Sequence, residues 1–369
     1  MSRRSTRRRT EYVLYLAVLP VYRNECMKLM RDSLGLGLTC FASPSHLDPS
    51  VRTGIDSALY TSVRISRLGR VAFLQRGHWN AALRAHTTVL DLNPRSLTAW
   101  LLLLGRRALR RRTLLWGHLH PQKGGASPTA WLRQGMTMLA SGVVTYTYTQ
   151  QSEADRTGRR AWVAPNSLYR RGDITPGNRL GAHRDTILYV GRLEPEKKVS
   201  LLVEAFAHAV HHGNLQAVLR LVGGGSEEER LHVLVRHHGV EDLVRFDGNI
   251  TSVDRLRELY GSAICSTSPG FVGLGLTQSL GFGVPQIVAR GEPHSPEVEL
   301  ARLGGVRWFD SNDVKGLAAA LVDAQADAQL LPLHAISSSV RERYSAEAMA
   351  DGLVDALHDR HDSPRSISA

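Results

Sequence analysis

The sequence predicts an α/β protein built from two doubly wound domains, each a parallel sheet with helices on both faces. Three observations support this prediction. Short apolar runs alternate with amphipathic helical stretches along the chain, an order typical of parallel sheets with right-handed crossovers. The alternation stops once, over 169–184, where glycine, proline and polar residues replace it. The length of 369 residues suits two domains of ordinary size.

In the first half, the apolar runs and helical stretches predict the elements in order. Strands are predicted at 12–19, 38–42, 71–74, 87–92, 113–116, 142–147 and 162–164, and helices at 23–34, 97–112 and 129–139. Gly35 suits the end of the first helix, because glycine accepts the left-handed conformation found there. Ser96 suits the start of the second, because its hydroxyl accepts a backbone N–H.

The second half repeats the pattern after the linker. Strands are predicted at 186–190, 216–222, 244–246, 263–266 and 286–289, and helices at 201–212, 226–238, 253–260, 274–282, 313–324 and 346–358. Ser226 and Glu229 have the spacing of a capping box. The predicted organisation is a basic, disordered N-terminus (1–10), an N-terminal Rossmann-like domain (11–178), a C-terminal Rossmann-like domain (179–345), a final helix (346–360) and a disordered tail (361–369). Both sheets are expected to turn the carboxyl ends of their strands, where ligands bind, toward one cleft.

Charge divides unevenly along the chain. Residues 1–180 hold 28 basic and 9 acidic side chains, whereas the remainder holds 18 and 25. A basic half suits nucleic acid, an anionic membrane surface or an acidic ligand, or it forms only a solvated face. Five arginines lie among the first nine residues, and five more gather at the end of one predicted helix: Arg106, Arg107, Arg110, Arg111 and Arg112. No helix-turn-helix or aromatic stacking platform accompanies the charge, which argues against nucleic acid.

The sequence also indicates where the protein works. No apolar run approaches the ~18 residues of a membrane-spanning helix, and Pro20 interrupts the run that a secretory signal would need. The three cysteines show neither metal-ligand spacing nor a disulfide framework. We therefore expect a cytoplasmic protein, with the arginines holding it peripherally on the inner face of the cell membrane.

Two segments of the second half are candidates for chemistry. In 187–206, a strand ends at Gly191, Arg192 follows at once, and Lys197 precedes a helix. Two cations beside a helix N-terminus form an anion site that suits a diphosphate, although a surface loop with incidental charges is the alternative. In 268–285, five glycines lie within 14 residues, from the end of a predicted strand through the helix that follows it. Such glycines let backbone approach a ligand closely, or serve only tight packing.

Together these segments resemble the C-terminal domain of glycosyltransferase family 4, the retaining, nucleotide-sugar-dependent enzymes with the two-domain GT-B fold. The motif of that family is V-G-R-L-x-x-E-K-x-x-x-x-L-x-x-A-F, and residues 190–206 match every fixed position. The resemblance spans about 186–357 and implies that Arg192 and Lys197 clamp the donor diphosphate. It also implies that the final helix returns to the N-terminal domain.

The resemblance departs from the family at two carboxylates. The family carries two glutamates, of which the first usually contacts the donor sugar and the second the ribose. Gly270 and Gln278 stand at these positions. The form P-G-x-V-G-L in 269–274 resembles a bacterial subgroup. By this resemblance the donor site comprises Gly191, Gly270, Gly273, Leu274 and Gln278, and Gln278 keeps a hydrogen-bonding group for the ribose.

The N-terminal half offers weaker candidates. His118 follows a predicted strand at its carboxyl end, where similar enzymes often place a histidine or aspartate near the sugar, although a lone loop histidine is more often incidental. Asn24, at the first strand–helix turn, is a candidate hydrogen-bond donor to a phosphate of the nucleotide. Asn166 resembles the residue that ends this domain in such enzymes. We name Arg192, Lys197 and His118 as candidate catalytic residues.

These observations predict a retaining hexosyltransferase. It would move a sugar from a nucleoside diphosphate sugar to a saccharide or lipid-linked saccharide acceptor, in cell-surface polysaccharide or glycoconjugate biosynthesis. We expect no cofactor and no metal requirement, because Arg192 and Lys197 would neutralise the leaving diphosphate. Two alternatives stay open. One is a degenerate GT-B protein that acts as a non-catalytic partner or sensor, suggested by the missing carboxylates. The other is a basic nucleic-acid-binding protein.

Overall fold

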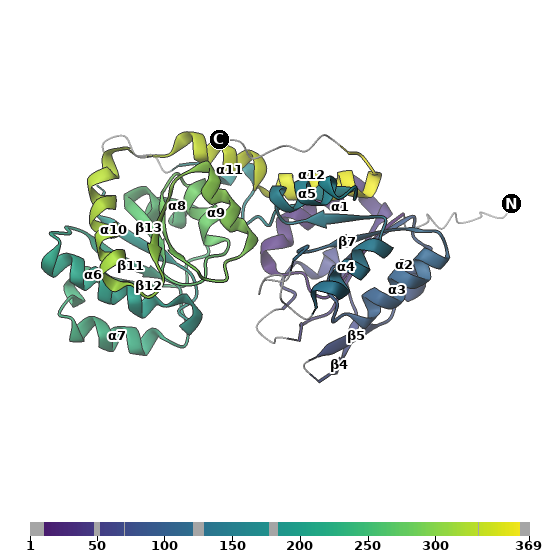
Figure 1. The fold of residues 1–369 in the computed structure, drawn as a ribbon, viewed down its shortest axis with the longest axis horizontal. Helices are drawn as coiled ribbons and strands as arrows, with labels where there is room; N and C mark the ends of the chain where they lie inside the picture. Colours follow the sequence, from purple (N-terminus) through teal and green to yellow (C-terminus); the bar gives the residue numbers. More distant parts are fainter. Residues whose placement is uncertain are drawn as a thin grey trace. The chain divides into compact units, whose positions relative to one another are not determined.

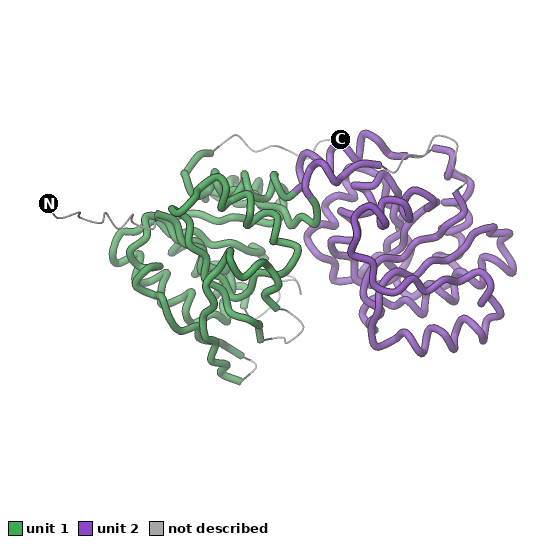
Figure 2. Tube along the Cα trace, turned by 180° about the vertical axis from the view of Figure 1, so that it is seen from behind, with its two compact units in different colours: residues 1–169, 346–367 green, residues 170–345, 368–369 purple. Residues whose placement is uncertain are grey.

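The structure, a computed structural model, describes residues 11–47, 52–69, 71–120, 129–176, 184–330 and 332–361. The chain divides into two compact units, coloured separately in Figure 2. Unit 1 comprises residues 1–169 and 346–367, and unit 2 comprises residues 170–345 and 368–369. The first division therefore falls after Tyr169, ahead of the predicted domain boundary at 178. The predicted tails, 1–10 and 362–369, lie outside the described residues.

Unit 1 contains a sheet whose strands all pair in parallel. Its members are β1 (Tyr12–Leu16), β2 (Leu38–Ala42), β3 (Thr61–Ser62), β6 (Thr87–Asp91), β7 (Arg112–Trp116), β8 (Gly142–Thr145) and β9 (Ala161–Val163). The order is β3-β2-β1-β6-β7-β8-β9. The chain leaves β1 toward one edge and later returns to its other side at β6, so the topological switch point lies between these two strands.

Helices cover both faces of this sheet. They are α1 (Asn24–Leu34), α2 (Trp79–Arg84), α3 (Leu97–Ala108), α4 (Ala130–Leu139), α5 (Tyr148–Arg156) and α12 (Ala346–His358). One core cluster joins α1 and α12 to the sheet, and the other joins α2, α3, α4 and α5 to its opposite face. Figure 1 shows α12, in yellow at the end of the chain, beside α1. The predicted return of the final helix is confirmed.

A hairpin in unit 1 corrects one predicted strand. The stretch predicted at 71–74 forms β5 (Ala72–Arg76), which pairs with β4 (Arg64–Leu68) in a separate antiparallel ribbon. A single parallel bridge between Phe73 and Ser96, in which the Phe73 amide donates to the Arg95 carbonyl at 2.9 Å, and the side chain of Gln75 attach this ribbon to the domain. Gln75 donates from Nε2 to the Leu16 carbonyl at 2.9 Å and to Ser43 Oγ at 2.9 Å. An apolar run of four residues carries no signal that distinguishes a strand of the parallel sheet from a strand of a separate antiparallel ribbon.

Unit 2 repeats the doubly wound arrangement. Its parallel sheet contains β10 (Thr186–Val190), β11 (Val218–Val222), β12 (Val244–Gly248), β13 (Ala263–Ser268), β14 (Gln286–Arg290) and β15 (Val306–Asp310), in the order β12-β11-β10-β13-β14-β15. The switch point lies between β10 and β13. The strand β15 was not predicted, because the charged Arg307 and Asp310 interrupt its apolar run.

Alternating side chains of this sheet contact helices on its two faces. The helices are α6 (Val199–His212), α7 (Glu228–His237), α8 (Val253–Ser262), α9 (Gly275–Gly281), α10 (Val314–Ala326) and α11 (His334–Arg343). Ile187 and Tyr189 belong to the core cluster with α6, α7 and α10. Leu188 is equally buried but belongs to the opposite face. Two parallel-sheet α/β units confirm the predicted fold class.

Two local predictions need correction. The predicted capping box is wrong, because α7 begins only at Glu228, and the Ser226 hydroxyl instead donates to Glu194 Oε2 at 2.7 Å. The arginine cluster is not one solvated surface either. Arg106 is fully buried, and its guanidinium donates to backbone carbonyls that include those of Ala85 and His86. Arg106 therefore anchors the segment after α2 and is unavailable to a membrane.

Candidate functional site

The switch point of unit 2 holds a small cavity where β10 and β13 end. Its volume is about 140 Å³. It is lined by Tyr189, Val190, Gly191, Arg192, Lys197, Ser268, Phe271, Gly273, Leu274 and Gly275. Parallel sheets bind ligands at this location. The structure thus brings together Gly191, Arg192, Lys197, Gly273 and Leu274, which the sequence analysis named as site residues.

Lys197 is half-buried in this cavity, beside Phe271. It ends a short 3-10 helix, Pro195–Lys197, directly before α6. Its ammonium group donates to the Phe271 carbonyl at 2.9 Å and lies 4.4 Å from the centre of the Phe271 ring. Burial, with a smaller contribution from the charge of Arg192, lowers the pKa of Lys197 to about 8. The lysine is therefore held in a fixed position, and its ammonium group loses its proton at a lower pH than an exposed lysine does.

Arg192 is the exposed member of the pair. Its guanidinium contacts Glu196 at 3.0 Å, with 61% of the arginine side chain exposed, so this ion pair contributes little stability. The backbone beneath it is fixed, because the Tyr189 hydroxyl donates to the Arg192 carbonyl at 2.7 Å. A long side chain on a fixed backbone leaves Glu196 readily when a stronger anion arrives.

Gly270 is required by a close approach of two loops. A Cβ atom at this position would lie 2.4 Å from the Glu196 carbonyl oxygen. The same carbonyl accepts a hydrogen bond from the Phe271 amide at 3.1 Å. The loop after β13 therefore packs directly on the Pro195–Lys197 turn and carries Phe271 to Lys197. A glutamate side chain has no room at position 270 in this arrangement.

Gln278 lies apart from the cavity. It sits in α9 with 5% of its surface exposed and does not line the cavity, unlike Gly273 and Leu274. On the neighbouring side, Gly223 supports the turn after β10, because a Cβ there would meet the Gly191 carbonyl oxygen at 1.8 Å. Close backbone packing around Gly191 therefore shapes this end of the sheet.

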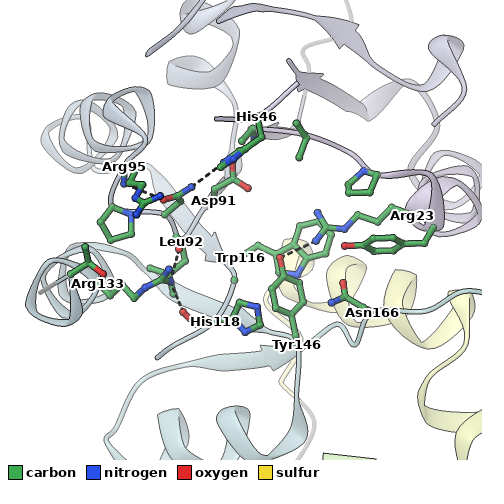
Figure 3. A pocket seen from close by; sticks show the side chains of 18 residues that line it. Arg23, His46, Asp91, Leu92, Arg95, Trp116, His118, Arg133, Tyr146 and Asn166 are labelled. Atoms are coloured by element: carbon green, nitrogen blue, oxygen red, sulfur yellow. Dashed lines mark hydrogen bonds between the residues drawn. The ribbon is translucent and has the colours of Figure 1, made fainter. Parts of the chain in front are cut away.

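A larger cavity of about 530 Å³ lies at the switch point of unit 1, beyond the ends of β1, β6 and β7. Figure 3 shows its side chains converging from several strand ends. The lining includes Arg23, His46, Asp91, Asn93, Arg95, Trp116, His118, Arg133, Tyr146 and Asn166. His118 and Asn166, both singled out from the sequence, are thus among its walls.

His118 is a neutral member of this cavity. It follows Gly117 at the end of β7, and its ring lies 4.8 Å from that of Tyr146 in an edge-on arrangement. Burial lowers the pKa of His118 to about 4, and the charges of Arg133 and Arg23 add to that effect. At neutral pH this imidazole can exchange hydrogen bonds but carries no charge.

Asn24 plays a different part from the one expected. Its Oδ1 accepts a hydrogen bond from the Asp56 amide at 2.9 Å, and the residue does not line the cavity. The preceding residue, Arg23, lines it instead. Sequence reasoning missed Arg23, Arg133 and Asp91. Only Asp91 had a signal, because it is a polar residue at the carboxyl end of a buried strand, the feature that identified His118.

Comparison with known proteins follows the same division of the chain. Residues 173–342, almost the whole of unit 2, match the family described as glycosyl transferases group 1. Unit 2 therefore matches this family, in agreement with the resemblance drawn from its motifs.

Two relatives of known activity are similar to part of the chain. The chain is 30% identical over 178 residues to D-inositol 3-phosphate glycosyltransferase 2 of Catenulispora acidiphila, covering 44% of this chain and 41% of that protein. It is 31% identical over 144 residues to the lipopolysaccharide core biosynthesis glycosyltransferase LpsD of Rhizobium meliloti, covering 38% and 41%. The matches therefore span well under half of these relatives.

The fold matches along nearly the whole chain. The structure of Anabaena HepE in complex with UDP superposes with a TM-score of 0.62 at 13% identity, over 95% of this chain and all of that one. Sucrose-phosphate synthase from Thermosynechococcus elongatus gives 0.61 at 17% identity, over 95% and 98%. The fold is therefore GT-B. Within the described part of the chain, no helix combines the length and apolarity needed to cross a membrane.

Proposed function

We propose that the protein is a retaining glycosyltransferase that moves a hexose from a nucleoside diphosphate sugar to a saccharide or lipid-linked saccharide. The observation that carries this proposal is the placement of Arg192 and Lys197 around one cavity at the end of β10. Two cations beside the N-terminus of helix α6 suit a diphosphate. The match of unit 2 to the glycosyl transferases group 1 family and the UDP bound to HepE support this choice of donor.

The reaction depends on the leaving group. The acceptor hydroxyl attacks the anomeric carbon from the face that the diphosphate leaves. The new C–O bond forms as the sugar–phosphate bond breaks, and the departing phosphate takes the hydroxyl proton, so the configuration is retained. Negative charge grows on the diphosphate, and cations already in place stabilise it. Arg192 and Lys197 supply that charge, and for this reason we propose that the reaction requires no metal ion.

Unit 1 would hold the acceptor in its larger cavity, with neutral His118 as one hydrogen-bonding group of that cavity. Cell-surface polysaccharide or glycoconjugate biosynthesis is the proposed context, supported by the likeness to LpsD, whose name places it in lipopolysaccharide core biosynthesis.

A thermal-shift screen of nucleotides and nucleotide sugars, followed by a transfer assay on the stabilising compounds, tests the proposal. We expect one nucleoside diphosphate to raise the melting temperature and the corresponding nucleotide sugar to be consumed, with and without EDTA. Loss of transfer with EDTA and rescue by Mg²⁺ or Mn²⁺ would overturn the metal-free mechanism. Stabilisation without any transfer would favour the non-catalytic alternative, which the glycine and glutamine at positions 270 and 278 motivate.

Donor binding should weaken as the pH rises through about 8. Lys197 is charged below its lowered pKa of about 8 and neutral above it, whereas a diphosphate keeps its charge over this range because its last ionisation lies near pH 6. The dissociation constant of the identified nucleoside diphosphate, measured by calorimetry between pH 7 and 9.5, should therefore increase. In Lys197→Arg the increase should vanish, because arginine stays charged. An identical pH profile in both proteins would contradict this assignment.

Peripheral membrane binding through the basic face of unit 1 is the second part of the proposal. Arg107, Arg110 and Arg111 are exposed, and they border a cavity of about 620 Å³ together with Arg112 and Arg160. Asp359 is the only acidic residue in that lining. Each arginine near an anionic leaflet contributes about 1 kcal/mol of attraction. The arginines at positions 3–9 lie outside the described residues.

Cosedimentation with phosphatidylglycerol vesicles tests this part. We expect binding at low salt that is lost at high salt, because screening shortens the range of the attraction. A triple variant with Arg107, Arg110 and Arg111 changed to glutamine should bind less. Equal binding to neutral vesicles, or an unchanged triple variant, would exclude a role for this face. Binding to random DNA with no response to nucleotides would instead favour the nucleic-acid alternative.

A further inference from the structure

The cavity of unit 1 has an excess of positive charge that nothing in the described structure balances. Three arginines line it, Arg23, Arg95 and Arg133, and Asp91 is its only acidic residue. The lining histidines do not change the sign, because His118 is neutral at pH 7. The cavity therefore carries a net positive charge at the place where unit 1 would bind its ligand.

Arg23 is the most constrained of these cations. It is 5% exposed, and its guanidinium lies 4.1 Å from the centre of the Trp116 ring. One terminal nitrogen, Nη2, donates to the Tyr146 hydroxyl at 2.9 Å, while the buried Nε has no partner. A guanidinium out of water without a carboxylate partner is costly to keep. The aromatic rings hold this charge in place but do not neutralise it.

Arg133 and Arg95 lie together on the other side of the cavity (Figure 3). Arg133 donates through Nη1 to the carbonyls of Leu92 and His118, both at 2.8 Å, and its Nε has no partner. Arg95 is exposed, and its side chain forms no hydrogen bond with any described residue. These contacts fix Arg133 through neutral carbonyls, so both side chains keep their full charge for a ligand.

Asp91 is not a counter-ion for all three. Its carboxylate accepts a hydrogen bond from the Ala17 amide, which ties it to the end of β1. Burial raises the pKa of Asp91 to about 6, although the Ala17 amide and the charge of Arg23 act in the opposite direction. A single carboxylate with a raised pKa offsets at most one of the three guanidinium charges.

We propose that the acceptor bears an anionic group, a phosphate or a carboxylate, and that Arg23, Arg95 and Arg133 recognise it. Guanidinium groups bind both anions through paired, charge-assisted hydrogen bonds. That this anion belongs to the acceptor rests on the proposed function, whereas anion binding by this cavity does not. Neutral sugars would leave the excess positive charge of the three arginines unbalanced, and the cavity would therefore discriminate against them.

Calorimetric titration of the full chain tests the proposal with three probes: glucose 6-phosphate, glucuronate and glucose. All titrations use the Arg192→Gln background, which removes the principal exposed cation of the unit 2 cavity, so that binding there does not confuse the result. We expect one of the two anions to bind at least about tenfold more tightly than glucose, the factor that one charge-assisted hydrogen bond supplies. The stronger anion identifies the acceptor group as phosphate or carboxylate.

Variants locate the binding. Arg95→Gln and Arg133→Gln should each weaken the anion at least about tenfold and leave glucose unchanged. Arg84→Gln is the matched control, because Arg84 is an exposed arginine of the same unit outside the cavity. Arg95 is exposed, so its variant should keep the wild-type melting temperature even if Arg133→Gln does not. Equal affinity for glucose and both anions, or unchanged anion affinity in Arg95→Gln and Arg133→Gln, would overturn the proposal. Nucleotide binding in the wild-type chain is scored separately and decides the proposed function alone.

Discussion

Replacing Lys197 with methionine should lower kcat/KM for sugar transfer by about 10²–10³-fold. A preorganised donor aimed at developing charge is worth about this much, and the Lys197 ammonium is held in place by Phe271 before any ligand arrives. Methionine keeps an unbranched side chain in the same space, so packing against the Phe271 ring should survive. Steady-state kinetics with the identified donor measures the effect, and Arg192→Ala should change the rate in the same direction.

Lys315→Met provides the control for this experiment. Lys315 is exposed on α10, outside the cavity, and losing its charge should leave kcat/KM within about twofold of wild type. Both variants should unfold at nearly the same temperature as the wild-type protein. Near-normal turnover in Lys197→Met would show that the lysine does not stabilise the leaving group, and the assignment of the unit 2 cavity would fall with it.

Introducing the family's usual glutamate at position 270 should damage the protein. The Cβ of any residue there would lie 2.4 Å from the Glu196 carbonyl oxygen, and this neighbour is backbone. Either the loop after β13 or the Pro195–Lys197 turn must then move, and both carry the contacts of Lys197. We expect Gly270→Glu to lose at least about 2 kcal/mol of unfolding free energy together with most donor binding.

Urea unfolding of Gly270→Glu and Gly261→Ala separates this effect from a general cost of replacing glycine. Gly261 lies in α8, and a Cβ there would meet nothing within 4 Å. Gly261→Ala should therefore stabilise the protein by about 0.5–1 kcal/mol. If Gly270→Glu were as stable as wild type and bound the donor more tightly, the glycine would be a loss from the family motif without structural consequence.

The elements that could be predicted are those whose side chains are dictated by burial on two faces. β2 and β10 have the predicted bounds, because a strand covered by helices on both sides is mostly apolar. The ribbon of β4 and β5 was not predicted, since its attachment depends on the Gln75 side chain and on a bridge between Phe73 and Ser96, which no apolar pattern reveals. Helix α5 was not predicted for a related reason, because polar residues such as Gln150 and Glu153 leave its sequence without a clear apolar period.

The candidate sites divide along the same line. Arg192 and Lys197 were predictable, because both belong to a continuous motif of seventeen residues that surrounds one strand end. The packing of Phe271 on Lys197 joins positions 74 residues apart, and no local pattern reveals it. Arg23 was hidden in a different way. Its isolated charge resembles any surface arginine until the fold places Trp116 and Tyr146 against it.

Helix α12 also imposes an order on the making of the protein. It supplies Met349, Leu353 and Leu357 to the core of unit 1, but the ribosome produces it only after all of residues 170–345. At ~5–20 residues per second, about 10–35 s separate the two segments of unit 1. Throughout that interval, the apolar surfaces of α1 and the sheet that α12 later covers are open to water or to a chaperone. Unit 2 is therefore complete before unit 1, although it starts later, and the nascent chain must carry an unfinished half until its last helix emerges.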